Sequence, residues 1–455
     1  MWTNLVACVR QCAVVVAVDR RTSMESALNT GDTAWMLTAA AMVLLMIPGL
    51  AFFYGGMVRS KSVLNTLMMV MGALFLVGVL WVIFGYSMTF GTSIGGIVGD
   101  PTEFLGLESL MADDPEATLP VMAFVAFQGM FACLTVGLIA GAIPDRTKFN
   151  GWLVFGGIWA VLVYFPVAHW VWASGGWIFE MGVIDFAGGT AVHINAGAAA
   201  LALAIVIGKR AGWPKTPMRP HNLTLVMIGA ALLWFGWFGF NAGSALAANN
   251  ASAVVFLNTF AATCAAAIGW LIVEKLRDGH MTTLGAASGI VAGLVAITPA
   301  CSAVSPVGAL IVGVLAGVLC ALAVSMKYRF GYDDSLDVVG IHLVGGLLGT
   351  LLIGFLATDL APAGVNGLLY GGGAEQLGKQ AIGAFSVMAY SFVVALIIGL
   401  ILKAAGIMRI AREDELSGID LVEHAESAYE LGDSGGGGHF VGIGAGSVRR
   451  DREGI

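Results

Sequence analysis

The stretch DFAGGTAVHINAGAAALALAIVIG, residues 185–208, places an aspartate eight residues before a histidine at the start of a long apolar run. A second stretch, DDSLDVVGIHLVGG at 333–346, repeats this spacing from Asp334 to His342. Ionisable groups are costly in the hydrocarbon interior, so those found there usually face a cavity or a proton, ion or substrate route. Each pair alone leaves two interpretations open: a pathway, or a structural histidine with a loop aspartate.

The composition of the 455-residue chain indicates a membrane protein. Hydrophobic residues make up 58% and charged residues only 11%, and the mean hydropathy is +0.87. A helix needs roughly 20 mostly apolar residues to cross a bilayer. We therefore expect an all-α polytopic membrane protein with eleven transmembrane helices, at 34–57, 63–90, 120–143, 151–171, 187–208, 223–246, 253–273, 284–299, 306–326, 338–357 and 381–403.

Lysine and arginine are concentrated in every second connection between the expected helices. Cytoplasmic loops carry an excess of both residues. One set of connections, together with the tail from Lys403, contains Arg59, Lys61, Arg146, Lys148, Lys209, Arg210, Lys215, Arg219, Lys275, Arg277, Lys327 and Arg329. The other set contains only Lys379, and its 91–119 loop is acidic. We therefore expect the N-terminus outside and the C-terminal tail in the cytoplasm. The net charge of −7 gives no reason to expect nucleic acid.

The two ends of the chain differ in composition from its middle. We expect an N-terminal extension and extracellular lead-in at 1–33, a transmembrane domain at 34–403 and a cytoplasmic tail at 404–455. The first 23 residues have some signal-peptide character but no convincing cleavage site, which leaves the native start open between Met1 and Met24.

The sequence contains no pattern typical of an enzyme. Six cysteines are scattered without metal-ligand spacing, so free thiols are expected. Neither a metal cluster, a nucleophilic triad nor a cofactor-binding loop accompanies the histidines. We therefore expect no catalytic activity, no cofactor and no metal.

The expected topology sends the chain through the fifth and tenth helices in opposite directions. Eight helical residues carry His193 about 12 Å below Asp185 from one side, and His342 about 12 Å below Asp334 from the other. Both histidines then approach the middle of the bilayer. We therefore expect two inverted five-helix repeats, an arrangement that places substrate sites near mid-membrane, with the eleventh helix facing lipid.

A pathway lined by buried histidines favours neutral species. An unpaired ion in a low-dielectric interior is penalised by on the order of tens of kcal/mol in the Born limit, far more than a neutral group. Buried imidazoles should be mainly neutral and able to donate and accept hydrogen bonds at once. Asp185, near the outer mouth, either stabilises an entering cation or caps a helix end, and the sequence leaves both interpretations open.

Aromatic and hydroxyl side chains gather at the expected outer mouth. The motif VWASGGW places Trp172 just beyond the fourth helix, and FGFNAGSA places Phe240 and Ser244 at the outer end of the sixth. Such aromatics either anchor the protein at the membrane surface or attract a small cation through their ring faces. Position alone favours the anchor.

At this point the motifs indicate a family. The chain closely resembles ammonium transporters of the Amt class, which are related to methylammonium permeases and Rhesus glycoproteins. The resemblance spans about 30–430 and rests on PGLAFFYGG, AFQGMFACLTVGLIAGA, AHWVW, DFAGGTAVHINAG, GFNAGSA and DDSLDVVGIHLVGG. Residues 1–23 and 434–446 fall outside it, and WASGGWIFEMGVID carries a local insertion relative to the family.

The resemblance implies a role for each candidate residue. In the family pattern, Trp172, Phe131 and Ser244 form an outer ammonium-recruitment site, Phe131 and Phe240 form a stacked gate, Asp185 is the acid linked to ammonium binding and deprotonation, His193 and His342 line the pore, and Trp237 borders it.

The resemblance also implies the mechanism and the assembly. Ammonium, or methylammonium, is captured outside and loses its proton, and ammonia crosses while the proton follows a separate route. Family members are typically homotrimers in the plasma (inner) membrane that serve nitrogen uptake. The outer aromatics favour this branch over the Rhesus branch, and the short tail favours transport over sensing.

The tail carries a further resemblance. AREDELSGIDLVEHAESAYE, residues 411–430, is similar to the family's cytoplasmic C-terminal motif, including Gly418, Asp420, His424, Glu426 and Tyr429. This implies cooperation between subunits and a PII-class signalling protein as partner. The alternative is a solvated amphipathic tail.

Overall fold

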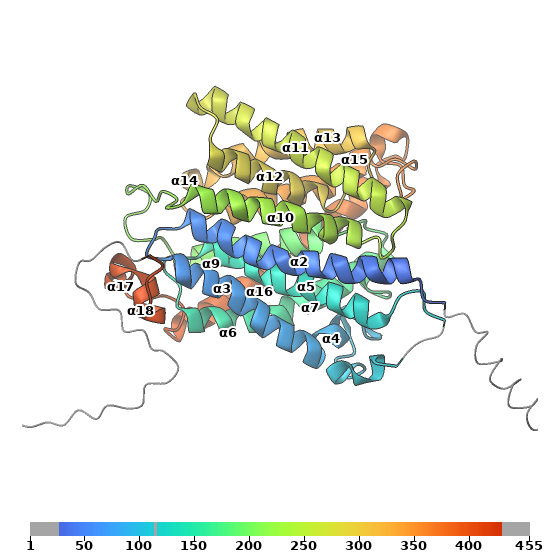
Figure 1. Ribbon diagram of the computed structural model, residues 1–455, viewed down its shortest axis with the longest axis horizontal. Coiled ribbons are helices and arrows are strands. Elements are labelled where there is room, and N and C mark those ends of the chain that lie inside the picture. The colour runs from blue at the N-terminus through green and yellow to red at the C-terminus, as the bar shows by residue number, and fades with distance from the viewer. Residues whose placement is uncertain (1–26, 113–115, 430–455) are drawn as a thin grey trace, which may run out of the picture.

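The computed structural model describes residues 27–112 and 116–429, which form one bundle of helices. In Figure 1 the long helices lie side by side along the horizontal direction, with the start of α2 at one end and the short helices α17 and α18 at the other. The expectations for 1–23 and 434–446 lie outside the described residues.

Ten segments of the described chain are long and apolar enough to cross a membrane. They are α2 (Thr30–Met57); α3 (Val63–Leu80) with η1 (Trp81–Gly85) and α4 (Tyr86–Phe90); α5 (Val121–Ile139) with η3 (Ala140–Ala142); α6 (Phe149–Trp159) with η4 (Ala160–Tyr164), α7 (Phe165–Trp172) and α8 (Trp177–Glu180); η5 (Gly189–Ile194) with α9 (Asn195–Ile207); α10 (Leu223–Gly243); α11 (Asn250–Asp278); α13 (Pro306–Ala323) with α14 (Met326–Phe330); η6 (Val339–Leu343) with α15 (Val344–Leu356); and α16 (Glu375–Ala404). They coincide with ten of the expected runs, although several begin or end some residues away, because interfacial turns extend the apolar cores.

The remaining expected run is shorter than a span. The helix α12 (Thr283–Ile297) has 15 residues, which at 1.5 Å per residue cover about 22 Å. Eleven of these residues are buried, and α12 packs against α10, α11, α13 and α15. Protein surrounds this helix, so it does not need the length of a lipid-facing span.

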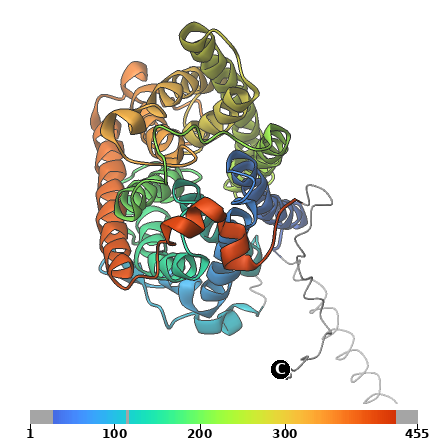
Figure 2. The same cartoon turned by 90° about the vertical axis from the view of Figure 1, so that its left-hand side faces the viewer.

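The other elements lie between the long helices or after them. They are the two-residue strands β1 (Ser93–Ile94) and β2 (Val98–Gly99), which pair antiparallel, the 3₁₀ turns η2 (Leu105–Leu110) and η7 (Leu368–Tyr370), and the tail helices α17 (Arg412–Ser417) and α18 (Ile419–His424). Figure 2, seen from the tail end, shows α17 and α18 lying across the end of the bundle.

Glycine allows the closest helix contacts. A Cβ at Gly229 of α10 would lie 2.3 Å from the backbone nitrogen of Phe53 in α2, and one at Gly313 of α13 would lie 2.2 Å from the carbonyl oxygen of Ala262 in α11. Small residues let helix backbones approach closely in membrane proteins. These contacts set the distance between the helices that surround the centre of the bundle.

The two Asp/His stretches have the same local structure. Asp185 precedes η5 and Asp334 precedes η6, and each carboxylate accepts backbone N–H bonds from the first residues of the following helix. Both η5 and η6 are π-helical turns, and they contain His193 and His342. Single π-helical turns occur often at functional sites. The capping aspartate therefore positions the histidine-bearing turn in each stretch.

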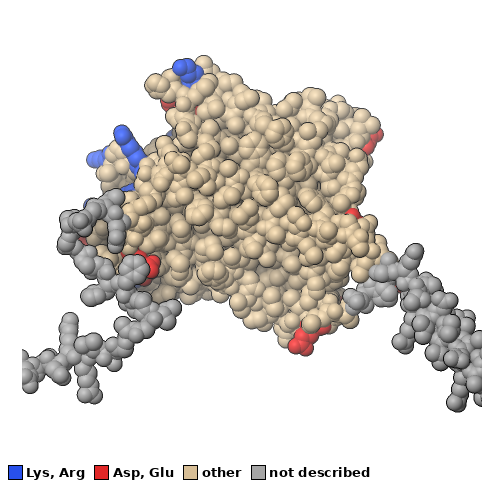
Figure 3. Space-filling model, in the orientation of Figure 1, with Lys and Arg blue, Asp and Glu red and all other residues tan. Residues whose placement is uncertain are grey.

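Charged residues leave a broad band of the surface free. On the face drawn in Figure 3, lysine and arginine lie toward the end that carries α17 and α18, and the tan surface between the two ends shows neither basic nor acidic residues. A protein surface without charges over such a width suits the hydrocarbon core of a bilayer, which is about 30 Å thick.

Candidate pathway through the bundle

An aromatic stack lies at one end of the candidate pathway. The rings of Phe131 in α5 and Phe240 in α10 are stacked, with centroids 4.0 Å apart and an interplanar angle of 15°. Both side chains are buried. Trp172, the last residue of α7, meets Phe131 edge to face at 5.9 Å. The structure therefore brings together the predicted gate and one aromatic residue of the predicted recruitment site.

Two hydrogen bonds hold the polar groups of the outer site. The Trp172 indole Nε1 donates to the backbone oxygen of Asp185 at 2.9 Å. The Ser244 hydroxyl donates to the backbone oxygen of Phe240, also at 2.9 Å. A hydroxyl that donates its only proton keeps its lone pairs free to accept. Ser244 can therefore accept a hydrogen bond from a cation, while the Trp172 ring face supplies the attraction of its quadrupole.

The two histidines lie in contact with each other, next to the stacked phenylalanines. Their Nδ1 atoms are 3.2 Å apart, and their ring centroids are 5.2 Å apart. His193 is 0% and His342 3% exposed. His193 also stacks on Trp237 at 5.4 Å and lies 6.2 Å from the Phe240 ring. An unbroken series of ring contacts thus connects Trp172 with His342.

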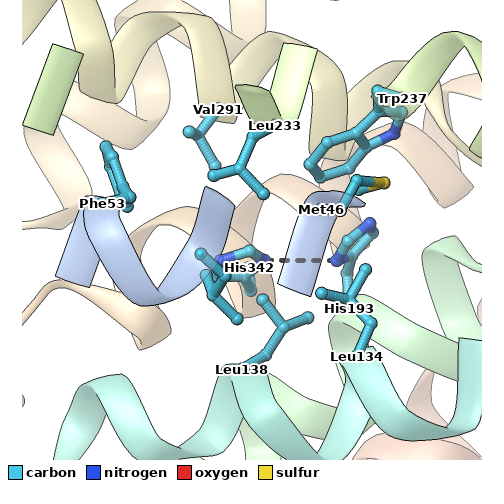
Figure 4. A pocket seen from close by; sticks show the side chains of 10 residues that line it. Met46, Phe53, Leu134, Leu138, His193, Leu233, Trp237, Val291 and His342 are labelled. Carbon is cyan, nitrogen blue, oxygen red and sulfur yellow. Dashed lines mark hydrogen bonds between the residues drawn. The ribbon is translucent and has the colours of Figure 1, made fainter. Parts of the chain in front are cut away.

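An apolar cavity of about 10 Å³ adjoins the histidine pair. Figure 4 shows the two imidazoles surrounded by hydrophobic side chains. Besides His193 and His342, the lining residues are Met46, Leu50, Phe53, Leu134, Leu138, Leu233, Trp237 and Val291. The buried Nε2 of His193 has no hydrogen-bond partner in the described part of the chain. A small polar molecule in this cavity would find hydrogen-bonding atoms mainly on the two imidazoles, between walls that are largely hydrocarbon.

Comparison with known proteins identifies the family. The profile of the Ammonium Transporter Family matches residues 34–429. The chain belongs to this family. Its resemblance to ammonium transporters, predicted from the motifs, is confirmed, and the chain is a multi-pass membrane transporter and not an enzyme.

Relatives in bacteria cover nearly the whole chain. An ammonium transporter of Mycobacterium tuberculosis (strain H37Rv) is 60% identical over 431 residues, which cover 88% of this chain and 90% of the relative. An ammonium transporter of Aquifex aeolicus is 45% identical over 409 residues, covering 90% and 95%.

Solved structures of the family have the same fold. Mep2 of Saccharomyces cerevisiae superimposes with a TM-score of 0.79 at 32% identity, covering 86% of this chain and 90% of Mep2. A structure titled "Sensor Amt Protein" superimposes with a TM-score of 0.80 at 29% identity, covering 87% and 98%.

Asp185 lies in a geometry that favours the capping interpretation. Its two carboxylate oxygens accept four backbone N–H bonds, at 2.6–2.9 Å, from residues 188–191. A carboxylate has about four lone-pair positions, so these bonds occupy its accepting capacity. In this member of the ammonium transporter family Asp185 therefore holds the start of η5 through its carboxylate.

Several pathway contacts could not be predicted from the sequence. The Trp237 indole Nε1 donates to the Thr298 hydroxyl at 2.8 Å, and that hydroxyl lies 2.7 Å from the backbone oxygen of Leu294 and 3.2 Å from Asn241 Oδ1. This polar group fixes the indole so that its ring faces His193. Thr298 lies 61 residues from Trp237 in the sequence, and a lone threonine at a helix end carries no signal of such a contact.

Metal-binding groups and cysteines were also considered in the sequence, and the structure shows the positions of the described ones. In the described ranges no group of three or more His, Cys, Asp or Glu is placed to hold a metal ion. Cys133, Cys264, Cys301 and Cys320 are free thiols, as expected from their scattered positions.

The C-terminal tail contacts the ends of two transmembrane segments. The Asp420 carboxylate accepts the backbone N–H groups of Leu64 and Asn65 at 3.0 and 2.8 Å, and Glu423 accepts that of Phe149 at 2.8 Å. These donors belong to the first turns of α3 and α6. Carboxylates are stabilising at helix N-termini, where backbone N–H groups lack partners. The described tail is therefore docked on the bundle, not extended in solvent.

Proposed function

We propose that this family member carries ammonium across the membrane by capturing it at Trp172, Phe131 and Ser244, removing its proton, and conducting ammonia past the histidine pair. One observation carries the proposal: the series of ring contacts from Trp172 through the stacked phenylalanines to His193 and His342 ends at an apolar cavity. Hydrocarbon walls penalise an ion far more than a neutral amine. Deprotonation before the cavity removes this penalty.

The outer site recruits the cation through complementary interactions. The face of an aromatic ring attracts a cation by roughly 0.5–2 kcal/mol, depending on how far the site is desolvated. Ser244 offers an oxygen lone pair, and the Trp172 indole is held next to Asp185 because its Nε1 donates a hydrogen bond to the Asp185 backbone oxygen. Methylammonium presents the same charge and donors and is a second substrate of this proposed site.

The histidine pair offers a route for the released proton. Because Nδ1 faces Nδ1 at 3.2 Å, one ring must donate and the other accept, and the two rings hold opposite tautomers. A proton delivered to one outer nitrogen and released from the other reverses this order. We propose that the proton passes along the pair in this way, separately from ammonia.

The same proposal includes the membrane arrangement. The family fold and the basic residues at the tail end support eleven crossings in two inverted five-helix repeats, with α12 as the short eighth crossing and α16 as the eleventh. The positive-inside rule places the tail in the cytoplasm and the start of α2 outside. We propose a homotrimer in the plasma (inner) membrane, with one pathway in each subunit.

We further propose that the tail regulates transport. Because Asp420 and Glu423 contact the first turns of α3 and α6, a partner that shifts the tail would disturb these helix ends. A PII-class signalling protein bound at this cytoplasmic surface is the proposed partner.

The decisive experiment measures current and ammonium uptake in parallel on proteoliposomes. An inward ammonium gradient should produce both a current and an accumulation of internal ammonium, and methylammonium should produce a smaller response of each kind. Because each ammonia is accompanied by its proton, internal pH should not rise as it does when ammonia enters alone. Protein-free liposomes of the same lipid provide the control. The absence of both ammonium-dependent current and ammonia flux would exclude the transport function.

A further inference from the structure

A second cavity lies on the flank of the bundle, apart from the pathway. Its volume is about 610 Å³, within the range of roughly 300–1,000 Å³ that is usual for ligand pockets. It opens between α9, α14 and the η6–α15 segment, and its apolar lining includes Leu201, Ile205, Phe330, Val339, Leu343 and Leu347. The end of α9 and α14 lie near the basic end of the bundle (Figure 1). We call this cavity the flank groove.

The apolar walls of the flank groove face outward. Ile205 is 51% and Phe330 64% exposed. Both belong to segments long and apolar enough to cross a membrane, so these side chains meet the hydrocarbon of the surrounding leaflet. An occupant of the groove must therefore be at least partly hydrocarbon.

The charges at the groove do not cancel. Only two of its lining residues, Lys209 and Asp333, are charged. The Asp333 carboxylate is fully buried and forms an ion pair with Arg210, at 2.7 Å to Nη2. Lys209 is exposed and forms no ion pair with any described residue, and its Nζ lies 5.1 Å from the centre of the Trp213 ring. The groove therefore presents one uncompensated positive charge at its mouth.

Neighbouring cations do not alter this balance. Arg329 directly precedes the lining residue Phe330 and is exposed, but it does not line the groove. The nearby Lys327 is neutralised by Asp337 at 2.6 Å. An apolar groove with the unpaired Lys209 at its basic end matches a molecule that has an acyl chain and an anionic head.

The described part of the tail, which ends at Tyr429, is not the occupant of the groove. Its last described residue, Tyr429, is bonded to His221 just before α10, at 2.8 Å. The groove instead lies between α9, α14 and α15. The described end of the tail is thus fixed at another part of the bundle.

We propose that the flank groove binds an anionic phospholipid of the leaflet at the basic end, with an acyl chain along Leu201, Ile205 and Leu347 and the phosphate at Lys209. Basic pockets between transmembrane helices on the cytoplasmic side bind anionic head groups, and one basic residue near the membrane surface contributes about 1 kcal/mol. This interaction energy corresponds to roughly a five-fold preference over a zwitterionic lipid with the same chains.

The test is photo-crosslinking from the groove itself. The full chain, with benzoylphenylalanine in place of Phe330, is placed in nanodiscs of equimolar phosphatidylglycerol and phosphatidylcholine with identical acyl chains. After illumination, mass spectrometry identifies the captured lipid. We expect phosphatidylglycerol to be captured about five times as often as phosphatidylcholine, and this preference to disappear in Lys209→Gln.

The matched control is Lys215→Gln, which removes an exposed lysine of the same connection that does not line the groove. It should keep the preference. Capture of both lipids in equal amounts by the otherwise unaltered chain would overturn the proposal, because the groove would then hold only bulk lipid. Crosslinks to a second copy of the chain would overturn it as well, since the groove would then be a subunit contact. Circular dichroism and elution volume confirm that each variant is folded, and no step of the test depends on ammonium transport.

Discussion

At the scale of single residues, the pathway is defined by which nitrogen atoms carry protons. The two Nδ1 atoms face each other, and the buried Nε2 of His193 has no partner among the described residues. The imidazoles can therefore hold one shared proton between them and present a donor or an acceptor at their outer ends. This arrangement explains why two histidines are placed in contact where one would suffice to line a wall.

Replacing either histidine should separate proton movement from ammonia movement. In His193→Ala or His342→Ala the relay is broken, so we expect ammonium-driven current to fall by about 100-fold, the lower end of what a positioned acid–base group contributes. Ammonia should still cross, and because its proton then stays outside, internal alkalinisation should appear. The control is His280→Ala, which alters an exposed histidine in the connection before α12. Unchanged current in both pathway variants would reject the relay.

Asp185 and Asp334 form a matched pair for separating capping from electrostatics. Asparagine cannot accept all the N–H bonds that either carboxylate accepts, and each unsatisfied buried group costs about 1–3 kcal/mol. We expect Asp185→Asn to lower the free energy of unfolding by about 2 kcal/mol and Asp334→Asn by less, because Asp334 accepts two such backbone bonds and Asp185 four. Thermal unfolding in detergent measures the loss of stability in both variants.

Transport then distinguishes the two roles of Asp185. If its charge assists ammonium capture, Asp185→Asn should lose about ten-fold more transport per folded molecule than Asp334→Asn, as expected when about 1.4 kcal/mol of interaction is lost. Equal losses in the two variants would confine Asp185 to holding η5.

At the scale of elements, the tail acts as a cap that comes from elsewhere in the sequence. The helix α3 has no capping side chain from its own N-cap residue, Ser62. Its first N–H groups are satisfied instead by Asp420, which lies 355 residues from Asn65. The position of the tail and the order of the α3 terminus are therefore linked.

Removing this distant cap should loosen the start of α3. Loss of a capping side chain costs about 1 kcal/mol, so in Asp420→Ala we expect the amides of Leu64 and Asn65 to exchange hydrogen roughly five times faster. Hydrogen–deuterium exchange with mass spectrometry measures this change. Glu413→Ala, at an exposed position of α17, should leave these amides unaffected. Equal exchange in all three proteins would show that the tail does not stabilise α3.

At the scale of the whole molecule, a buried ionic network joins the connections at the basic end. Arg210, just after α9, forms ion pairs with Asp333 and with Asp145. Burial raises the pKa of Asp333, but the hydrogen bonds from Arg210 and the charge of Arg146 outweigh it, so the pKa lies below its ordinary value. Burial likewise raises the pKa of Asp145, and the charges of Arg210 and Arg59 lower it further than burial raises it.

These pKa directions predict how stability depends on pH. A carboxyl group whose pKa is lower in the folded state stabilises that state above its unfolded pKa of about 3.9, and this contribution is lost as the pH falls through the folded pKa. We expect the melting temperature to be steady near neutral pH and to fall below about pH 4. In Asp333→Asn the melting temperature should be lower at neutral pH and should fall less when the pH is lowered. A melting temperature that rises on acidification would contradict this sign.

The sequence alone determined the segments that cross the membrane, the basic end and the spacing of both Asp/His stretches. The reason is that a bilayer demands long apolar runs, which are local properties of a chain. The roles proposed for His193 and Trp172 also rest on short motifs that resemble those of the family. The short α12 was the one expected crossing whose length departed from the rest, because its surroundings are protein and not lipid.

Only the tertiary structure decided which of these residues touch. His193 and His342 are 149 residues apart, and their contact depends on the rotation and crossing of α9 and α15. The stacking of Phe131 on Phe240 depends in the same way on α5 and α10. Hydrophobic length specifies how far a helix reaches but not which face it turns to its neighbour. That face is set by close packing, which placed the Asp185 carboxylate on the first N–H groups of η5 and brought the tail to the start of α3.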